Sequence, residues 1–339
     1  MDYLVVLSDK NTDWTKPLWE FRVVENYTED TSLILYKFHH SLMDGVGFAS
    51  IMSSINDDQF TSKINKQFVQ PSIMLRLKAM FNSVILLVNL FLSKSVCFTD
   101  QKATKMLETN RNDAFPSKFY TSHEYDFKKI VKCYKQYPNM TFNDYMMSIF
   151  SKSCHQLLNE NGVKDAKELG VEILVNMRQL PTRYEDIILC NYFVSFPFGI
   201  QLFDNISAIY QTLKPLTEAF KSQEAVYTVY YLRYIIMTFI PKQIFINLFA
   251  DKPLPNQIFT SNIAFSDIPW RINGKEIRNI SINIQTVHGY VGGLSVYTYN
   301  GKARFGLQYV RNLKMDYTKL IDNIISNLDE EISNIEKSD

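Results

Sequence analysis

Two Asn-Gly dipeptides, at residues 273–274 and 300–301, constrain the fold of the C-terminal half more than any other feature of the sequence. They lie within "WRINGKEIRNISI" and "GLSVYTYNGKARFGLQYV", where β-prone residues flank them on both sides. A two-residue hairpin turn of type I′ needs positive φ at both central positions, and Asn-Gly provides this at low cost. The sequence therefore predicts two β-hairpins. The apolar segments "GVEILVNM" and "YFVSFPFGI" predict buried strands in the same half.

Two longer segments predict amphipathic helices. Residues 141–158, "TFNDYMMSIFSKSCHQLL", begin with Thr141 and Asp144 at the spacing of a capping box. Apolar residues recur at helical spacing in this segment and again in residues 317–335. The expected buried stripes are Phe142, Tyr145, Met146, Ile149 and Phe150 in the first helix, and Leu320, Ile321, Ile324, Ile325, Leu328 and Ile332 in the second.

The N-terminal half begins with an apolar run at residues 31–38, "TSLILYKF", which predicts a buried strand. The segment "DGVGFASIMSSI" then predicts a turn followed by a short helix. We expect Phe48, Ile51, Met52 and Ile55 to lie on one side of this helix.

Aromatic residues make up 14% of the chain, which reflects either a compositional preference or an apolar channel or membrane-facing surface. Residues 79–93 contain no charge and have Arg76, Lys78 and Lys94 as basic flanks. Residues 227–249 carry four tyrosines on one helix face and are interrupted by Pro241. The first segment is shorter than the roughly 20 apolar residues that span a bilayer. The alternatives are core helices or interfacial helices anchored by Tyr, Trp and basic flanks.

Charge and cysteine content argue against several classes of protein. The 36 basic and 35 acidic residues are well mixed, so no basic stripe indicates a nucleic-acid partner. The four cysteines, at positions 97, 133, 154 and 190, form no CxxC pair, and no histidine lies at zinc spacing. We therefore expect no metal and a reduced, intracellular chain. No basic region followed by an apolar run opens the sequence, so we also expect no signal peptide.

The segment "YKFHHSLMDGVGF" places His39 and His40 side by side at the end of the predicted strand. Strand alternation puts Tyr36, Phe38 and His40 on one face and His39 on the other, so the two imidazoles point apart. A histidine at a strand end that faces an apolar cavity is well placed as a general base, because imidazole exchanges protons near neutral pH. The alternative is that both histidines are structural turn residues.

Asp44 precedes Gly45 in the predicted turn. A carboxylate at such a position commonly accepts hydrogen bonds from the backbone or from a buried arginine. No serine or cysteine occupies an obvious nucleophile position in the sequence. The pattern therefore favours direct transfer in a ternary complex, in which His40 takes the proton from an acceptor hydroxyl as the hydroxyl attacks.

"HHSLMDG" resembles the HHxxxDG motif of the superfamily of acyl-CoA-dependent acyltransferases and condensation domains. The surrounding sequence is similar to the bifunctional wax ester synthase/diacylglycerol acyltransferase family. The similarity runs in order from about Lys16 to Leu328. The blocks that carry it are "KPLWEFRVVE", "TFNDYMMSIFSKSCHQLL", "VNMRQLP", "LCNYFVSFPFGI", "SNIAFSDIPWRINGKEI" and "GLSVYTYNGKARFGLQYV".

This resemblance implies an α/β fold of two chloramphenicol-acetyltransferase-like domains, each a mixed sheet flanked by helices, with a tunnel between them. We place the domains at residues 1–115, which hold the HHxxxDG motif, and at residues 116–339. Family members carry a substantial segment ahead of "KPLW", whereas 15 residues precede Lys16 here. We therefore expect the first domain to be truncated at its N-terminus and to lack part of the wall of the acyl-CoA tunnel.

The resemblance also implies roles for single residues. The candidate catalytic residues are His40, Asp44 and His39, and the candidate supporting residues are Gly45, Arg178 and Asn262. His40, the second histidine of the motif, is the implied base and is expected to face the tunnel, with His39 turned into the packed fold. Asp44 is expected to pair with an arginine from the second half of the chain, for which Arg178 is the candidate. The block after "SN" lacks the usual Pro and Gly, so we expect a loop of different shape there.

The implied function is an acyl-CoA-dependent O-acyltransferase that moves a long acyl group to a fatty alcohol or diacylglycerol. Its product would be a wax ester or a triacylglycerol. Acyl-CoA is a substrate here, and no cofactor is expected. We further expect peripheral attachment to the endoplasmic reticulum or a lipid droplet through residues 79–93 and 227–249. The alternatives are a catalytically impaired lipid-binding or scaffold protein of the same fold, and a relative that acylates another alcohol or amine.

Overall fold

A seven-stranded mixed sheet forms the centre of the molecule. The computed structural model describes residues 13–58, 60, 70–92, 99–108, 117–241, 243, 258–284, 290–310 and 312–337. The strands, in their order across the sheet, are β3 (Ser117–Thr121), β11 (Lys302–Val310), β10 (Gly292–Tyr299), β7 (Ile258–Ser266), β5 (Glu168–Asn176) and β6 (Phe193–Gln201), with β4 (Tyr125–Asp126) beside β11. β7 runs parallel to β10 and β5, and the other neighbours are antiparallel. The expected α/β class with a mixed sheet is confirmed.

Both Asn-Gly pairs form the predicted hairpins. Asn300 and Gly301, with φ of 49° and 67°, connect β10 to β11 inside the large sheet. Asn273 and Gly274, with φ of 51° and 73°, connect two short strands that form a sheet of their own. These strands are β8 (Arg271–Ile272) and β9 (Lys275–Glu276). Positive φ at both central residues explains why this dipeptide is used twice.

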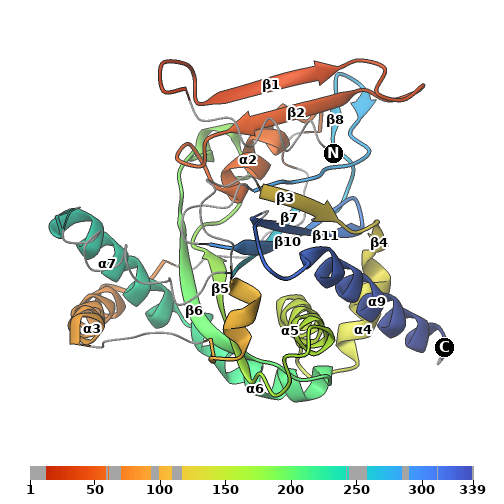
Figure 1. Cartoon of the computed structure of the whole chain (residues 1–339). Coiled ribbons are helices and arrows are strands. Elements are labelled where there is room, and N and C mark those ends of the chain that lie inside the picture. Colours follow the sequence, from red (N-terminus) through yellow and green to blue (C-terminus); the bar gives the residue numbers. More distant parts are fainter. Residues whose placement is uncertain are drawn as a thin grey trace.

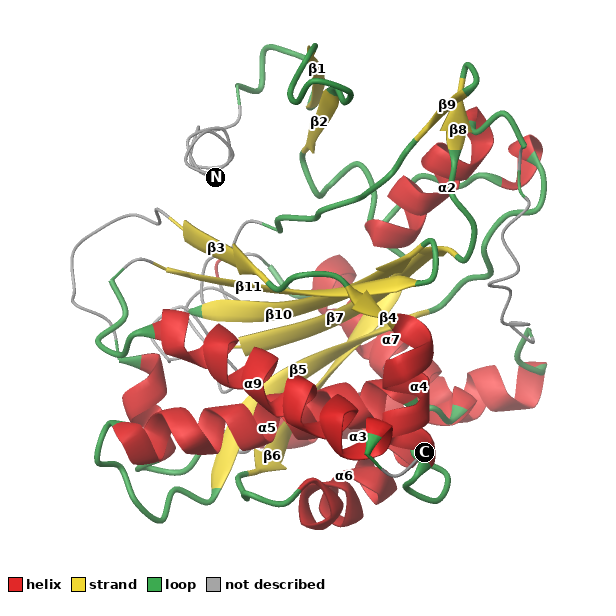
Figure 2. Cartoon of the chain, turned by 90° about the vertical axis from the view of Figure 1, so that its right-hand side faces the viewer, coloured by secondary structure: helices red, strands yellow, loops and turns green. Residues whose placement is uncertain are grey.

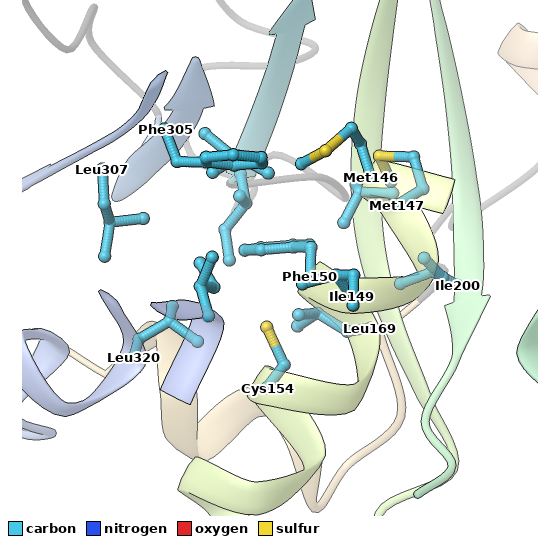
Figure 3. Packing of buried hydrophobic residues seen from close by; sticks show 14 of the residues in the cluster. Met146, Met147, Ile149, Phe150, Cys154, Leu169, Ile200, Phe305, Leu307 and Leu320 are labelled. Atoms are coloured by element: carbon cyan, nitrogen blue, oxygen red, sulfur yellow. The ribbon is translucent and has the colours of Figure 1, made fainter. Parts of the chain in front are cut away.

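Helices cover one face of the large sheet (Figure 2). They are α4 (Phe127–Lys135), α5 (Phe142–Glu160), α6 (Ile206–Phe220) and α9 (Tyr317–Glu336). Thr141 and Asp144 form the predicted capping box at the start of α5. Phe150 and Cys154 of α5 then pack among Leu169, Phe305 and Leu320, which come from the sheet and from α9 (Figure 3). The stripe of α9 is buried or partly buried as predicted.

The opposite face of the sheet carries helix α2 (Gly45–Ile55) and, beyond it, an antiparallel pair of strands, β1 (Trp19–Val24) and β2 (Leu33–Phe38) (Figures 1 and 2). Phe48 of α2 contacts Phe265 of β7, with 6.1 Å between the ring centroids. Of the residues expected on one side of α2, Met52 is buried, whereas Ile55 is exposed. β2 is a strand as predicted but is not a buried one, because it pairs with a single strand, β1, in the described part of the chain.

Helices α3 (Ile73–Leu92) and α7 (Gln223–Phe239) pack against each other beside β6 and project from the body of the molecule (Figure 1). Two short 3₁₀ helices, η1 (Ala103–Leu107) and η2 (Tyr184–Asp186), lie in connections. Within the described residues, none of the helices is both long and apolar enough to cross a bilayer. The expected domain boundary at residues 115–116 lies outside the described residues, as do residue 93 and most of 242–249.

Candidate active site

The histidine pair lies in a turn and not in the strand that precedes it. β2 ends at Phe38, and the amide of Leu42 donates to the carbonyl of His39 at 3.0 Å. Tyr36 and Phe38 share one face as predicted, because both rings contact Phe48 of α2 at centroid distances of 5.7 and 5.6 Å. The alternation of the strand does not extend to the two histidines. Their orientations are therefore set by the turn and by its neighbours.

Asp44 ends this turn and begins α2. It is the N-cap residue of the helix, and its Oδ1 accepts from the amide of Gly47 at 2.9 Å. Oδ2 accepts from the amide of Tyr192 at 3.0 Å, and the guanidinium of Arg178 also donates to Oδ1. Asp44 is thus a nearly buried carboxylate with backbone donors and one cation around it. A carboxylate with this many fixed donors holds a loop in place.

Arg178 completes the pair that the sequence predicted. It follows β5 by two residues, and its side chain is 12% exposed while that of Asp44 is 8% exposed. Its NH2 group also donates to the carbonyl of Cys190 at 3.2 Å, and its own amide donates to Oδ1 of Asn176 at 3.2 Å. The guanidinium therefore links the motif turn to the segment at Cys190.

The segment from Cys190 to Phe193 is a partner of the motif that the sequence analysis did not identify. The carbonyl of Cys190 accepts from the amide of Asp44 at 3.4 Å, and Asn191 donates from Nδ2 to the carbonyl of His40 at 2.7 Å. Together with the Tyr192 amide, these bonds hold both ends of the turn. The block "LCNYF" precedes a strand, and an asparagine at such a strand start was the available signal.

His40 projects from this fixed turn into solvent. Its side chain is exposed, and its ring meets that of Phe193 edge-on at a centroid distance of 6.2 Å. Among the residues that the structure describes, no hydrogen bond engages its imidazole, so both ring nitrogens are open to a substrate group. Phe193 also lies under Arg233 of α7, whose NH1 donates to the Phe193 carbonyl at 3.3 Å. The prediction that strand alternation places His40 on the face of Tyr36 and Phe38 is wrong, because β2 ends at Phe38 and the His40 ring contacts Phe193.

The prediction that His39 lies in the packed fold is wrong. We expected it in the packed fold, whereas its side chain is half-buried at the surface against the exposed ring of Trp14, at a centroid distance of 5.0 Å. Its Nδ1 lies 2.7 Å from the Ser41 hydroxyl and accepts from the Ser41 amide at 3.2 Å. Since a backbone amide donates only, Nδ1 is an acceptor in this turn. The His39 ring is hydrogen-bonded to Ser41, whereas the His40 ring has no hydrogen bond among the described residues.

Two further predicted site residues, Gly45 and Asn262, contact different elements: Gly45 lies against β7, and Asn262 bonds to α5. A Cβ at Gly45 would lie 2.5 Å from Cδ1 of Ile263, so the glycine allows α2 to approach β7 closely. At Gly47 a Cβ would lie 2.7 Å from Cβ of Met43, which makes this second glycine a further requirement of the turn. The role of Asn262 stays a prediction. Its Nδ2 donates at 2.5 Å to Asn143 of α5, on the helix-covered face of the sheet.

Two phenols border the turn, Tyr36 on β2 and Tyr192 beside Asp44. Burial raises the pKa of Tyr36, and burial also raises the pKa of Tyr192. Both therefore remain neutral hydroxyls at neutral pH.

In the described ranges, no group of His, Cys, Asp or Glu side chains is arranged to hold a metal ion.

The mixed sheet flanked by helices has the fold of the two-domain, chloramphenicol-acetyltransferase-like acyltransferases and condensation domains whose solved structures are compared below. The sequence identifies the family within this class. The model of the wax ester synthase/diacylglycerol acyltransferase catalytic domain matches residues 2–122, and that of the C-terminal domain of the same proteins matches residues 191–331. The chain belongs to the wax ester synthase/diacylglycerol acyltransferase family, and it is thereby assigned to the acyl-CoA-dependent O-acyltransferases.

Solved structures support the fold. The wax ester synthase/diacylglycerol acyltransferase from Marinobacter aquaeolei VT8 matches with a TM-score of 0.61 and 16% identity over 98% of this chain and 75% of that one. A trichothecene 15-O-acetyltransferase from Fusarium sporotrichioides matches with a TM-score of 0.58 and 12% identity, over 96% and 74% of the two chains. The starter condensation domain of rhizomide synthetase, solved with C8-CoA and Leu-SNAC, has a TM-score of 0.56 and 10% identity, over 98% and 73%. A search of curated proteins found no match.

Proposed function

We propose that the protein transfers a long acyl group from acyl-CoA to a fatty alcohol or to diacylglycerol, with His40 as the general base. The observation that carries this proposal is the contrast between the two histidines. His40 is exposed and has no hydrogen bond to its ring among the described residues, while His39 is bonded to Ser41. A base must reach the proton that it removes, so the free ring on the fixed turn is the better candidate.

In the proposed reaction the acceptor hydroxyl lies within hydrogen-bond reach of the His40 imidazole. Its oxygen attacks the thioester carbonyl carbon while a ring nitrogen of His40 accepts its proton. The carbon–sulfur bond then breaks, and the imidazolium returns the proton to the sulfur of the leaving CoA. One ester and one CoA thiol result. No acyl-enzyme forms and no cofactor takes part.

Asp44 and Arg178 act in this proposal as positioning residues. The carboxylate is occupied by the Gly47 amide, the Tyr192 amide and the guanidinium, so it holds the turn and does not exchange protons with substrate. Asn191 has a similar role at the other end, through the carbonyl of His40. A catalytic group must be held to within a fraction of an ångström, and these bonds fix the backbone that carries the ring.

Apolar substrates are part of the proposal because of the surfaces beside His40. Phe193 contacts the imidazole, and each methylene that leaves water contributes about 0.8 kcal/mol to binding. We also propose that the chain works while attached peripherally to an intracellular lipid surface, the endoplasmic reticulum or a lipid droplet. The family relation and the exposed apolar side chains of α3 and α7 support this placement.

A lipid-binding or scaffold role without turnover is not favoured. A chain that no longer catalyses transfer has no need of a free histidine on a turn held by Asp44, Arg178 and Asn191.

The test of the proposed transfer is release of CoA by the purified protein, given palmitoyl-CoA with either hexadecanol or diacylglycerol. Release that requires an acceptor and disappears in His40→Ala supports the proposal. His123→Ala, at an exposed histidine beside Asp329 of α9, is the matched control and should keep full activity. Absence of release with both acceptors would refute it.

A further inference from the structure

Helix α3 turns a row of large apolar side chains toward solvent. We call this row the outer face of α3; it consists of Ile73, Leu77, Met80, Phe81, Val84, Ile85 and Val88. Their exposed fractions lie between 46% for Ile85 and 74% for Ile73. The residues follow helical spacing, so they form one continuous strip along a 20-residue helix. Scattered exposed apolar residues are ordinary, whereas a strip of this length marks an interaction surface.

The buried side of the same helix is made of small residues. Ala79 and Ser83 are fully buried, and Ala79 packs with Val226 and Tyr227 of α7. The orientation is fixed by polar contacts at the helix pair. Lys78 forms an ion pair with Glu224 at 2.8 Å, and Asn82 donates to the other carboxylate oxygen of Glu224 at 2.9 Å. The helix therefore presents its large apolar residues outward, the reverse of a water-facing surface helix.

Charge on the helix pair is mainly positive. Within α3 the charged residues are Arg76 and Lys78, and α7 adds Arg233 and Glu224. Glu224 is the single acid of the two helices, and Lys78 and Asn82 already occupy it. The helix pair therefore carries a net positive charge, and its one acid is already bonded. A second copy of the same chain would bring like charges together, whereas anionic phospholipids would be attracted.

Tyrosines gather beside the start of α3. A pocket of about 340 Å³ opens between the start of α3 and α7, lined by Gln70, Arg76, Tyr192, Tyr227, Tyr230, Tyr231 and Tyr234. Arg76 bonds there to the carbonyl of Pro71 and to Gln70. Tyrosine prefers the membrane–water interface because its ring is apolar and its hydroxyl is polar. An arginine among tyrosines suits a lipid phosphate at that level.

We propose that the outer face of α3 is the membrane-docking surface of the protein, and that it inserts into anionic phospholipid with Arg76 on a lipid phosphate. The proposal rests on the proposed function for the need to reach lipid substrates, but it concerns a different surface from His40. α3 lies in the plane of the membrane and does not cross it. Tyr192 lines the pocket and its amide holds Asp44, so the docked lipid lies next to the motif turn.

The test is flotation of the full-length protein with vesicles of phosphatidylcholine alone and of phosphatidylcholine mixed with phosphatidylserine. Wild type should bind the mixed vesicles more strongly. Leu77→Glu and Phe81→Glu should each weaken this binding about tenfold or more, because a carboxylate replaces an inserted apolar group. Val23→Glu on β1 is the matched control, since Val23 and Leu77 are each 54% exposed, and it should bind like wild type. Arg76→Gln should lose the preference for phosphatidylserine.

Equal binding of wild type to both vesicles, or equal weakening by Val23→Glu, would overturn the proposal. So would a dimer in solution that Leu77→Glu converts to a monomer, with no vesicle binding by either. Transfer from butyryl-CoA to a short soluble alcohol, without vesicles, separates this proposal from the enzymatic one. Leu77→Glu should keep this soluble activity. A protein that transfers without docking refutes the docking surface alone, and one that docks without transferring refutes the proposed function alone.

Discussion

Helices α5 and α3 are almost equal in length, 19 and 20 residues, yet they bury opposite kinds of surface. α5 places Tyr145, Ile149 and Phe150 fully inside the core between the sheet and α9. α3 buries Ala79 and Ser83 and leaves its large apolar residues exposed. The difference teaches that an apolar stripe shows which face avoids water, but not whether protein or lipid replaces the water.

The neighbours of each helix explain the difference. α5 lies between a sheet and α9, so its stripe meets apolar side chains across a wide layer. In the described part of the chain α3 packs chiefly against one helix, α7, and the residues fully buried there, Ala79 and Ser83, are small. A helix with a single neighbour buries about one row of residues. In α3 this row consists of small residues and Asn82, and the large apolar residues stay exposed.

The same substitution in both helices gives the largest expected contrast. Phe150→Ala removes a fully buried ring and should lower the free energy of unfolding by about 3–5 kcal/mol. Phe81→Ala removes a ring that is 67% exposed and should change it by less than about 0.5 kcal/mol in the absence of lipid. Urea unfolding followed by circular dichroism measures both values. A loss of several kcal/mol in Phe81→Ala would show that α3 is packed in solution, and the comparison of the two helices would then fail.

The next largest effect is expected at the motif turn. Asp44→Ala leaves the guanidinium of Arg178 and the amide of Tyr192 without their acceptor, at a nearly buried position. The variant should lose about 3 kcal/mol of unfolding free energy, the lower end of the range for a broken buried pair. Activity should fall with stability. A variant that unfolds like wild type and is nevertheless inactive would indicate a direct catalytic role for the carboxylate.

Much of the fold could be predicted from local sequence, and the reasons are physical. Asn273 and Asn300 lie before glycines at positions that need positive φ, and Thr141 and Asp144 cap a helix through their own side chains. Such signals act within a few residues. The strand at residues 33–38 was recognised, but its burial was not, because burial depends on how many strands flank it and which elements cover it.

The Asp44–Arg178 pair of the site was predicted, whereas features that depend on how the chain folds around the turn were missed. Asp44 and Arg178 were paired correctly from their motif positions. The predicted orientation of His39 was wrong, since β2 ends before this residue and the turn sets the direction of its side chain. Asn191 escaped notice because its bond to the carbonyl of His40 joins residues 151 positions apart, and no local pattern encodes such a contact.

A smaller effect on stability is expected from His39→Ala. The change removes the acceptor of the Ser41 amide and the contact with Trp14, both near the surface. The free energy of unfolding should fall by about 1 kcal/mol, the usual value for one lost hydrogen bond. Part of the activity should remain, measured as CoA release with palmitoyl-CoA and hexadecanol. Complete loss of activity in a folded variant would mean that the roles of the two histidines are exchanged.

His40→Ala should have the smallest effect on stability and should sharpen the contrast between structural and functional surfaces. Its ring is exposed and has no hydrogen-bond partner in the described residues, so the free energy of unfolding should stay within about 0.5 kcal/mol of wild type. Acyl transfer should nevertheless fall by roughly 10²–10⁴, the range for loss of a general base. His40→Gln, which keeps a polar side chain but no base, should be as inactive as His40→Ala. If His40→Gln keeps wild-type turnover, the ring serves only to shape the turn, and proton removal by His40 is excluded.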